Sequence, residues 1–398
     1  MKLSALITMT WKRGSANSPD VASRAIDRYI LDMTHTTDPR EASLLAGYAF
    51  PSARTRGRVY AETEHPYRSP YQRDRDRILH SAAFRRLSGK MQVFTGDHGD
   101  YHRTRLTHTM EVASIARTIG RALRLNEDLI ESLALLHDLG HPPFGHAGED
   151  VLDDYLKEEG GFSHNQFALT LVETLEQRYP SFPGLNLSRE LLDGQRARAN
   201  KAARTPVLLE VQVVDAADSI AYNAHDLDDA IKLGWIQIEE LTQVPLADES
   251  VRHAIAMSDE FPSRLLRQVI VRDLVERQVT SVLNASLAFL SDVGWSTPEE
   301  AMAADFKVQA EPEVARLASG FQAFLYKQVY RHERLLEMRR RAQTQLTELV
   351  ECLADRPDQI PAHYQYRVEQ VGTRRAAVEY VAGMTDRFCQ QHHEHLVG

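Results

Sequence analysis

The segment LALLHDLGHPPFGHAGED, residues Leu133–Asp150, joins an apolar stretch to a turn rich in glycine, proline and histidine. The apolar stretch ends at the adjacent pair His137 and Asp138. Gly140 and the two prolines after it stop a helix, so the pair is expected at a helix C-terminus beside an exposed turn. An aspartate in such an apolar setting needs a cation or a hydrogen-bond donor as its partner.

The residues before this pair predict one amphipathic helix. Asn126 is a good N-cap, and the acidic residues after it suit the positive end of the helix dipole. The apolar stripe then follows helical spacing, through Leu129, Ile130, Leu133 and Leu136.

Two further segments carry comparable polar residues. His108 lies in RTRLTHTMEVA, residues 103–113, and Asp218 lies in VVDAADSIAYNAHDLDDA, residues 213–230. A lone buried histidine is more often a satisfied core residue than a ligand. Together with His137 and Asp138, however, these residues form a mixed N/O set suited to one divalent ion, Mn²⁺ or Mg²⁺, with Fe²⁺ or Zn²⁺ as alternatives.

These three segments, in this order, closely resemble the deoxynucleoside triphosphate triphosphohydrolases of the HD superfamily. The resemblance implies an all-α fold, with an HD-domain helical core and additional C-terminal helices. It also implies a metal-dependent enzyme that converts a dNTP to a deoxynucleoside and tripolyphosphate.

Candidate proton-transfer residues follow the turn. If a helix restarts near Gly145, His146 and Glu149 stand at positions i and i+3 and can form a hydrogen bond that fixes the imidazole tautomer. The resemblance assigns this pair the catalytic role. It also places His164, in GGFSHNQFAL, near the substrate phosphates.

Further substrate contacts are expected from the same resemblance. Asp218, Tyr222 and Asp226 are spaced by four and share one stripe of a helix. The resemblance places Tyr222 and Asp226 at the deoxyribose, where the charged Asp226 accepts a hydrogen bond from the 3′-hydroxyl. An ordinary buried tyrosine and a solvated aspartate would look the same.

Other substrate-binding candidates surround the metal ligands. Arg105, three residues before His108, is expected at the triphosphate, and Gln92 at the nucleoside. His141 is placed with them, although it could equally cap the turn or support a ligand. Arg331 or Arg334 could complete the triphosphate site.

Composition narrows the class of protein. The chain has 398 residues, 43% of them hydrophobic, and a net charge of −9, which argues against general affinity for nucleic acid. A local basic block from Arg68 to Arg121 holds eleven Lys/Arg against five Asp/Glu, as expected near a polyanionic substrate or on a solvated helix face. Two cysteines without metal-finger spacing, and no long apolar run, predict a cytoplasmic protein without a membrane segment.

The chain divides into three expected regions: a variable N-terminal arm (1–60), the HD catalytic core (61–235) and a helical C-terminal region (236–398) that completes the pocket and forms the oligomer interface. The resemblance further implies a homo-oligomer and an effector that is a nucleotide or single-stranded DNA. Expected helices cover residues 21–33, 206–231, 248–260, 263–290, 311–355 and 374–395, with further helices from about Asp74 and Thr107 and a turn at 96–99.

Two other functions are compatible with the same ligand set. A different HD phosphohydrolase would act on nucleoside monophosphates or cyclic phosphodiesters. A non-enzymatic regulator would bind nucleic acid through the basic block and keep the metal for structure alone. The net charge and the His146–Glu149 pair weigh against the regulator.

Overall fold

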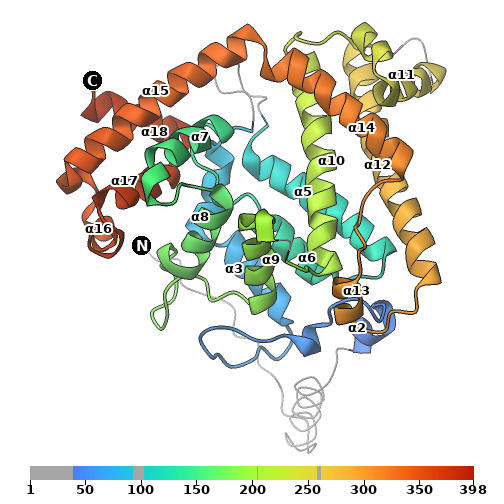
Figure 1. The fold of residues 1–398 in the computed structure, drawn as a ribbon, viewed down its shortest axis with the longest axis horizontal. Helices are drawn as coiled ribbons and strands as arrows, with labels where there is room; N and C mark the ends of the chain where they lie inside the picture. Colours follow the sequence, from blue (N-terminus) through green and yellow to red (C-terminus); the bar gives the residue numbers. More distant parts are fainter. Residues whose placement is uncertain (1–38, 93–102, 204, 258–260) are drawn as a thin grey trace, which may run out of the picture.

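The computed structural model describes residues 39–92, 103–203, 205–257 and 261–398. Within these ranges the chain is built from helices, and β-structure is limited to three isolated bridges (Figure 1). The all-α prediction is therefore confirmed. Of the sequence predictions, the helix at 21–33 and the turn at 96–99 lie outside the described residues.

Three helices form the centre of the molecule: α5 (Arg105–Ala122), α6 (Glu127–Leu136) and α10 (Leu209–Lys232). Helix α5 packs against both α6 and α10, and α3 (Pro70–Leu79) packs on α6. Their apolar stripes meet in one large core. Figure 1 shows α10 crossing the molecule beside α5 and α6.

Shorter helices surround this centre. Those of the N-terminal half are α2 (Pro39–Leu44), η1 (Ser52–Arg54), α4 (Ala82–Arg86), η2 (Leu87–Gly89), α7 (His146–Tyr155), η3 (Lys157–Glu159), α8 (His164–Thr170), η4 (Leu171–Leu175), α9 (Arg189–Ala199) and η5 (Lys201–Ala203).

The C-terminal half adds two groups of helices. A second core cluster joins the end of α10 to η6 (Ile238–Gln243), α11 (Pro245–Met257), α12 (Ser263–Asp292) and α14 (Pro312–Leu325). Helix α15 (Glu333–Asp355) passes over α7 and packs on α17 (Thr373–Ala382) and α18 (Asp386–Leu396) (Figure 1). The remaining short elements are α13 (Pro298–Ala303), η7 (Tyr326–Tyr330), η8 (Pro357–Gln359), η9 (Ala362–Tyr364) and α16 (Gln365–Val371).

Two long helices expected from the sequence are interrupted. The segment 311–355 divides at the π-helical turn η7, whose last residue, Tyr330, stacks on Tyr222 with ring centroids 6.3 Å apart. Just after this turn, His332 stacks on Trp235 with ring centroids 4.1 Å apart. The segment 374–395 divides where Thr385 caps α18 by accepting a hydrogen bond from the Phe388 amide. These side-chain contacts are not visible in the apolar periodicity.

Other boundaries differ by only a few residues. Helix α5 starts at Arg105 and not at Thr107, because the Thr104 side chain caps it. Residues 39–60 of the expected arm pack on the core, where Phe50 donates its amide hydrogen to the buried Glu210. The division at residues 60 and 235 stays a prediction. Among the described residues, no helix combines the length and apolarity that a membrane span requires.

Candidate metal and substrate site

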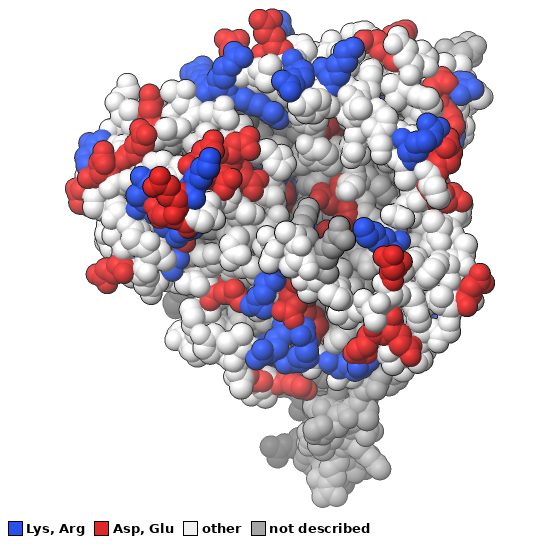
Figure 2. All heavy atoms as spheres, viewed as in Figure 1, with Lys and Arg blue, Asp and Glu red and all other residues white. Residues whose placement is uncertain are grey.

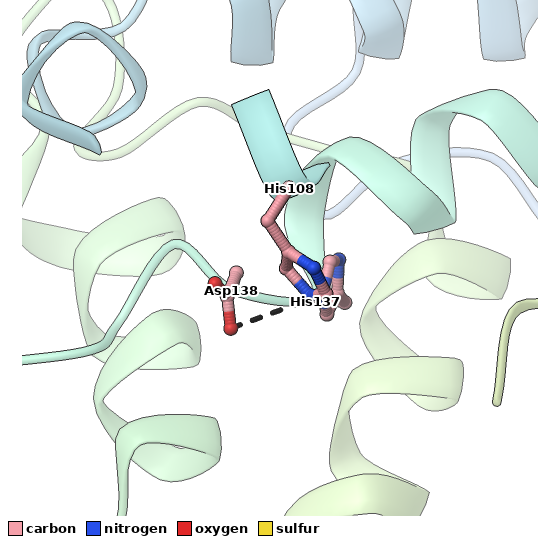
Figure 3. A group of neighbouring side chains, drawn as sticks. All are labelled: His108, His137 and Asp138. Carbon is pink, nitrogen blue, oxygen red and sulfur yellow. Dashed lines mark ion pairs between the residues drawn. The ribbon is translucent and has the colours of Figure 1, made fainter. Parts of the chain in front are cut away.

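The four candidate metal ligands come together from three helices. His108 lies in the first turn of α5, His137 and Asp138 directly follow α6, and Asp218 lies midway along α10. Figure 3 shows His108, His137 and Asp138 grouped at one point, with a dashed line from Asp138 to His137. The packing of α5 against α6 and α10 brings about this convergence.

His108, His137 and Asp138 offer ligand atoms that all lie within 4.8 Å of one another, and Asp218 lies close to both histidines. Nε2 of His108 lies 3.1 Å, and Nε2 of His137 lies 3.6 Å, from Oδ1 of Asp218. His137 Nε2 is also 3.8 Å from Oδ1 of Asp138. Atoms bound to one ion at roughly 2.0–2.2 Å are separated by similar distances.

An unpaired buried atom supports the same conclusion. His137 Nδ1 donates to the carbonyl oxygen of Ala134 at 2.6 Å, so Nε2 is the ring nitrogen that can offer a lone pair to an ion. That Nε2 is buried and has no hydrogen-bond partner among the described residues. Since an unpaired buried polar atom is costly, a cation at this point would satisfy it.

Both carboxylates are held in the charged form. Burial alone would raise the pKa of Asp138, but Arg105, His141 and His137 outweigh it and hold that pKa well below its usual range. Arg105 Nη1 and His141 Nδ1 each lie 2.8 Å from an oxygen of Asp138. Burial is likewise outweighed at Asp218, whose pKa is held low by the two candidate ligand histidines.

Arg105 and His141 thus lie behind a candidate ligand. Their side chains are 2% and 4% exposed, so both are enclosed beside Asp138. Burial and the Arg105 guanidinium hold the pKa of His141 well below its usual range, which keeps this imidazole neutral. Direct contact of either residue with the substrate stays a prediction.

A histidine and a glutamate that the sequence analysis missed orient His108. His108 Nδ1 lies 3.2 Å from Nδ1 of His225, and His225 Nε2 pairs with the carboxylate of Glu111. If Nε2 of His108 offers its lone pair to an ion, Nδ1 of His108 carries the hydrogen and donates it to Nδ1 of His225. Nε2 of His225 then carries a hydrogen and donates it to Glu111. The only sequence signal was spacing, since Glu111 is three residues after His108 and His225 seven after Asp218.

The candidate proton-transfer pair forms as expected. Helix α7 begins at His146, and His146 Nδ1 lies 3.2 Å from Oε2 of Glu149. The other oxygen of Glu149 accepts from the backbone nitrogen and from Nδ1 of His164, at 2.8 and 2.7 Å. Burial would raise the pKa of Glu149, but hydrogen bonds from both histidines lower it.

His141, Glu149 and His164 also form a group with closely spaced ligand atoms. The rings of His141 and His164 are stacked 3.7 Å apart at an angle of 25°, so their in-plane lone pairs do not converge. The Asn165 amide faces Nε2 of His164 at 2.9 Å. This geometry favours a hydrogen-bond network over a second metal site.

A pocket lies next to the candidate metal ligands. It has about 340 Å³ of empty space, part of which is open to solvent. Figure 2 shows one face of the molecule hollowed near its middle, with basic side chains along its upper edge. Three predicted site residues line it, together with four that the sequence analysis did not single out. The lining residues are Gln92, Phe144, His146, Ala147, Tyr222, Arg339 and Ala342.

The sugar-binding candidates share helix α10 with Asp218. The Tyr222 side chain lines the pocket, and Asp226 is 1% exposed with one carboxyl oxygen lacking a partner among the described residues. Burial and the nearby Asp229 raise the pKa of Asp226 well above its usual range. This shift opposes the charged acceptor expected at Asp226.

Comparison with known proteins shows the family. The HD domain family matches residues 105–223, and the phosphohydrolase-associated domain family matches residues 308–395. A deoxyguanosinetriphosphate triphosphohydrolase-like protein of Ralstonia pickettii is 40% identical over 365 residues, which are 88% of this chain and 94% of that protein. The chain belongs to the deoxyguanosinetriphosphate triphosphohydrolase-like family.

Other members of the deoxyguanosinetriphosphate triphosphohydrolase-like family are comparably similar. The protein from Geobacter metallireducens is 41% identical over 370 residues, 88% of this chain and 94% of its own. The protein from Leptospira interrogans is 37% identical over 374 residues, 90% of this chain and 97% of its own. Membership of this family supports phosphohydrolase activity and agrees with the candidate metal cluster.

The basic block expected near the substrate has another role in this family member. Most of its arginines form intramolecular ion pairs, some of them buried, as at Arg77 and Arg105, and some on the surface, as at Arg121. The pairs include Arg68 with Asp76, Arg77 with Glu62, Arg103 with Glu111 and Asp228, Arg105 with Asp138, and Arg117 and Arg121 with Glu127.

The arginine that lines the pocket is also not one of those expected. Arg331 donates to the Tyr326 hydroxyl at 2.8 Å, and Arg334 is exposed on α15. Arg339, two turns into α15, lines the pocket with its guanidinium over the Tyr330 ring. Sequence alone could not choose among the arginines of this stretch, because the break before α15 sets which helix face meets the pocket.

Proposed function

We propose that this chain hydrolyses deoxynucleoside triphosphates to a deoxynucleoside and tripolyphosphate. The observation that carries the proposal is one pocket, lined by Gln92, His146 and Tyr222, beside a buried His/Asp cluster. The family resemblance assigns each of these three residues a part in dNTP hydrolysis. The names of the relatives point to the same substrate class.

His108, His137, Asp138 and Asp218 would hold one divalent ion, either Mn²⁺ or Mg²⁺, with Fe²⁺ or Zn²⁺ as alternatives. When bound, the ion supplies positive charge beside the α-phosphate. Arg105 and His141 keep Asp138 charged and oriented. His225 and Glu111 fix the tautomer of His108.

The remaining residues position the substrate and move a proton. Water attacks the α-phosphorus and the bond from phosphorus to the 5′-oxygen breaks, so the three phosphates leave as one chain. His146 either takes a proton from the attacking water or gives one to the departing 5′-oxygen. Glu149 accepts a hydrogen bond from Nδ1 of His146. Tyr222 and Asp226 contact the sugar, Gln92 the nucleoside, and His164 and Arg339 the phosphates.

Product chromatography tests this function. The metal-loaded protein is incubated with each of the four dNTPs and the matching ribonucleotides, and the products are separated. Tripolyphosphate and a deoxynucleoside are expected. Inorganic phosphate from a monophosphate, or a linear dinucleotide from a cyclic one, would instead identify another HD phosphohydrolase, and salt-dependent DNA binding without turnover would identify a regulator.

The proposal extends to the cellular setting. We propose a cytoplasmic homo-oligomer whose activity responds to a nucleotide or to single-stranded DNA. Sedimentation with and without added dNTP or oligonucleotide measures the assembly state. Initial rates over the same additions measure the response.

A further inference from the structure

A chain of side-chain amides lies behind His164. Gln195, on α9, is buried at 2% exposure and donates from Nε2 to the backbone oxygen and to Oδ1 of Asn165, at 3.2 and 3.1 Å. Asn165 Nδ2 lies 2.9 Å from Nε2 of His164. His164 Nδ1 lies 2.7 Å from Oε1 of Glu149.

The backbone oxygen of Asn165 sets the direction of every hydrogen bond in this chain. A carbonyl oxygen can only accept, so it fixes the Gln195 amide with its nitrogen toward Asn165. The same NH₂ group faces the Asn165 side chain, which must therefore present its oxygen to Gln195 and its nitrogen to His164. His164 Nε2 then accepts, and the ring carries its hydrogen on Nδ1.

This tautomer determines how Glu149 is shared. Oε1 of Glu149 receives the backbone hydrogen and the Nδ1 hydrogen of His164, and Oε2 remains for Nδ1 of His146. His146 then carries its hydrogen on Nδ1. Its Nε2 lone pair is left without a partner in that network, on a residue that lines the pocket.

We infer that Gln195 and Asn165 are positioning residues that fix the His164 tautomer and so make Nε2 of His146 the atom that takes up or releases the proton. This inference rests on the proposed function for the reaction itself. Neither amide touches the pocket, because the lining residues do not include them. Their effect passes through His164 and Glu149.

The tautomer can be measured without turnover. Two-bond ¹H–¹⁵N spectra of the full chain, loaded with diamagnetic Mg²⁺ and labelled at histidine, separate protonated from unprotonated ring nitrogens. A His164→Asn variant identifies the His164 signals. The native chain is expected to show His164 protonated at Nδ1 alone.

Two substitutions should change that spectrum in defined ways. Gln195→Met keeps the side-chain length but removes the donor, so Asn165 is free to rotate and the single tautomer should give way to a mixture. Asn165→Asp presents only acceptors to His164 and should place a hydrogen on Nε2. In both variants kcat for a dNTP should fall by about ten-fold with the metal content retained.

Gln278→Met is the matched control. Gln278, on α12, is also buried, at 4% exposure, and donates to a backbone oxygen, that of Leu274 at 3.0 Å, but it does not line the pocket. It should lose comparable thermal stability and keep native kcat and native His164 signals. A native His164 protonated at Nε2 would overturn the inference, as would unchanged spectra or control-like kcat in both variants.

The same experiment separates this inference from the proposed function. If the native chain hydrolyses no dNTP while the His164 signals respond as described, the tautomer assignment stands and the function fails. If dNTP hydrolysis is found and the signals do not respond, the function stands and the amide chain has no positioning role.

Discussion

At the scale of single residues, the site combines two kinds of histidine. His108 and His137 are buried with Nε2 toward the candidate carboxylate ligands, whereas His146 has a half-exposed side chain that lines the pocket. Burial suits a residue that holds an ion, because water is kept from the ligand atoms. Exposure suits a residue that meets a substrate and a water molecule.

Removal of a buried ligand should therefore remove the ion. In His137→Ala and Asp138→Ala, bound metal and turnover should both be abolished, since the remaining ligands are poorly arranged around an ion. Elemental analysis after dialysis measures the metal, and His392→Ala, at a position outside both the candidate metal cluster and the pocket lining, is the control. Full metal occupancy with native turnover in either variant would refute the ligand assignment.

Removal of the exposed histidine should leave the ion in place. His146→Ala is expected to lower kcat by roughly 10²–10⁴ while the protein stays folded and keeps its metal. Glu149→Gln should show a smaller loss, since the proton-transferring ring remains. Loss of metal from His146→Ala would instead make His146 a ligand.

One partly buried carboxyl group on α10, that of Asp229, gives a pH-dependent stability. Burial raises the pKa of Asp229 to about 6, although Arg103 opposes the shift. The folded-state pKa lies above the ordinary value of 3.8, so the stability contributed by protonated Asp229 is full below 3.8 and is lost as pH rises through about 6.

Asp229→Asn should remove this loss. The Tm of the variant minus that of the native chain should be larger at pH 7.5 than at pH 4.5, by on the order of 2–4 °C. Thermal melts of both proteins at the two pH values measure the difference, with Asp358→Asn, at an exposed position, as control. A Tm difference independent of pH would contradict the assignment.

At the scale of elements, helix α10 connects metal and sugar binding. Asp218, Tyr222 and Asp226 are one turn apart, with Asp218 at the ligand cluster, Tyr222 in the pocket and Asp226 buried beyond it. A rigid helix holds these distances constant, so a substrate placed by its sugar is also placed relative to the candidate ion.

This arrangement predicts sugar specificity. A dNTP should be hydrolysed far faster than its matching ribonucleotide, and Asp226→Ala should lower kcat/KM for the dNTP by about 2- to 10-fold. This is the effect of one neutral hydrogen bond, worth about 0.5–1.5 kcal/mol, because the raised pKa favours a protonated carboxyl group. Metal content should not change. Equal rates with dGTP and GTP in the native chain would contradict the pocket assignment.

At the scale of the whole molecule, the C-terminal helices hold two sides of the pocket together. Asp386, the first residue of α18, accepts the amide hydrogens of Met91 and Phe144 at 3.0 Å each. Phe144 lines the pocket with an unusual φ of 62°, a conformation that needs support from its surroundings. Lys90 Nζ also donates hydrogen bonds to the backbone oxygens of His141 and Ala382, at 2.5 and 2.9 Å.

Loss of this carboxylate should therefore affect both stability and activity. Asp386→Ala leaves two amide hydrogens unpaired and should reduce the free energy of unfolding by about 1–3 kcal/mol. Turnover should fall as well, because Phe144 can relax. Glu210→Ala is the matched control, since the buried Glu210 carboxylate also accepts hydrogen bonds from two backbone amides, those of Phe50 and Asn126, and does not line the pocket. It should lose similar stability and keep its turnover.

Local chemistry alone predicted helix α6 and the position of two candidate ligands at its end. The Asn126 cap, the apolar stripe after it and the Gly140 stop define α6 and place His137 and Asp138 at its end, because caps and breakers act within a few residues. The spacing of His146 and Glu149 likewise predicted their hydrogen bond. The family resemblance, drawn from the same short segments, is confirmed by the comparisons.

Only the tertiary structure decided which polar groups pair across distant segments. Arg105 lies against Asp138 and not free in the pocket, His225 lies behind His108, and Gln195 reaches His164 through Asn165. Each of these contacts joins elements separated by loops, and sequence spacing carries no information on how two helices rotate about each other when they pack. The raised pKa of Asp226 could not be predicted for the same reason, because the burial that causes it is a property of the assembled core.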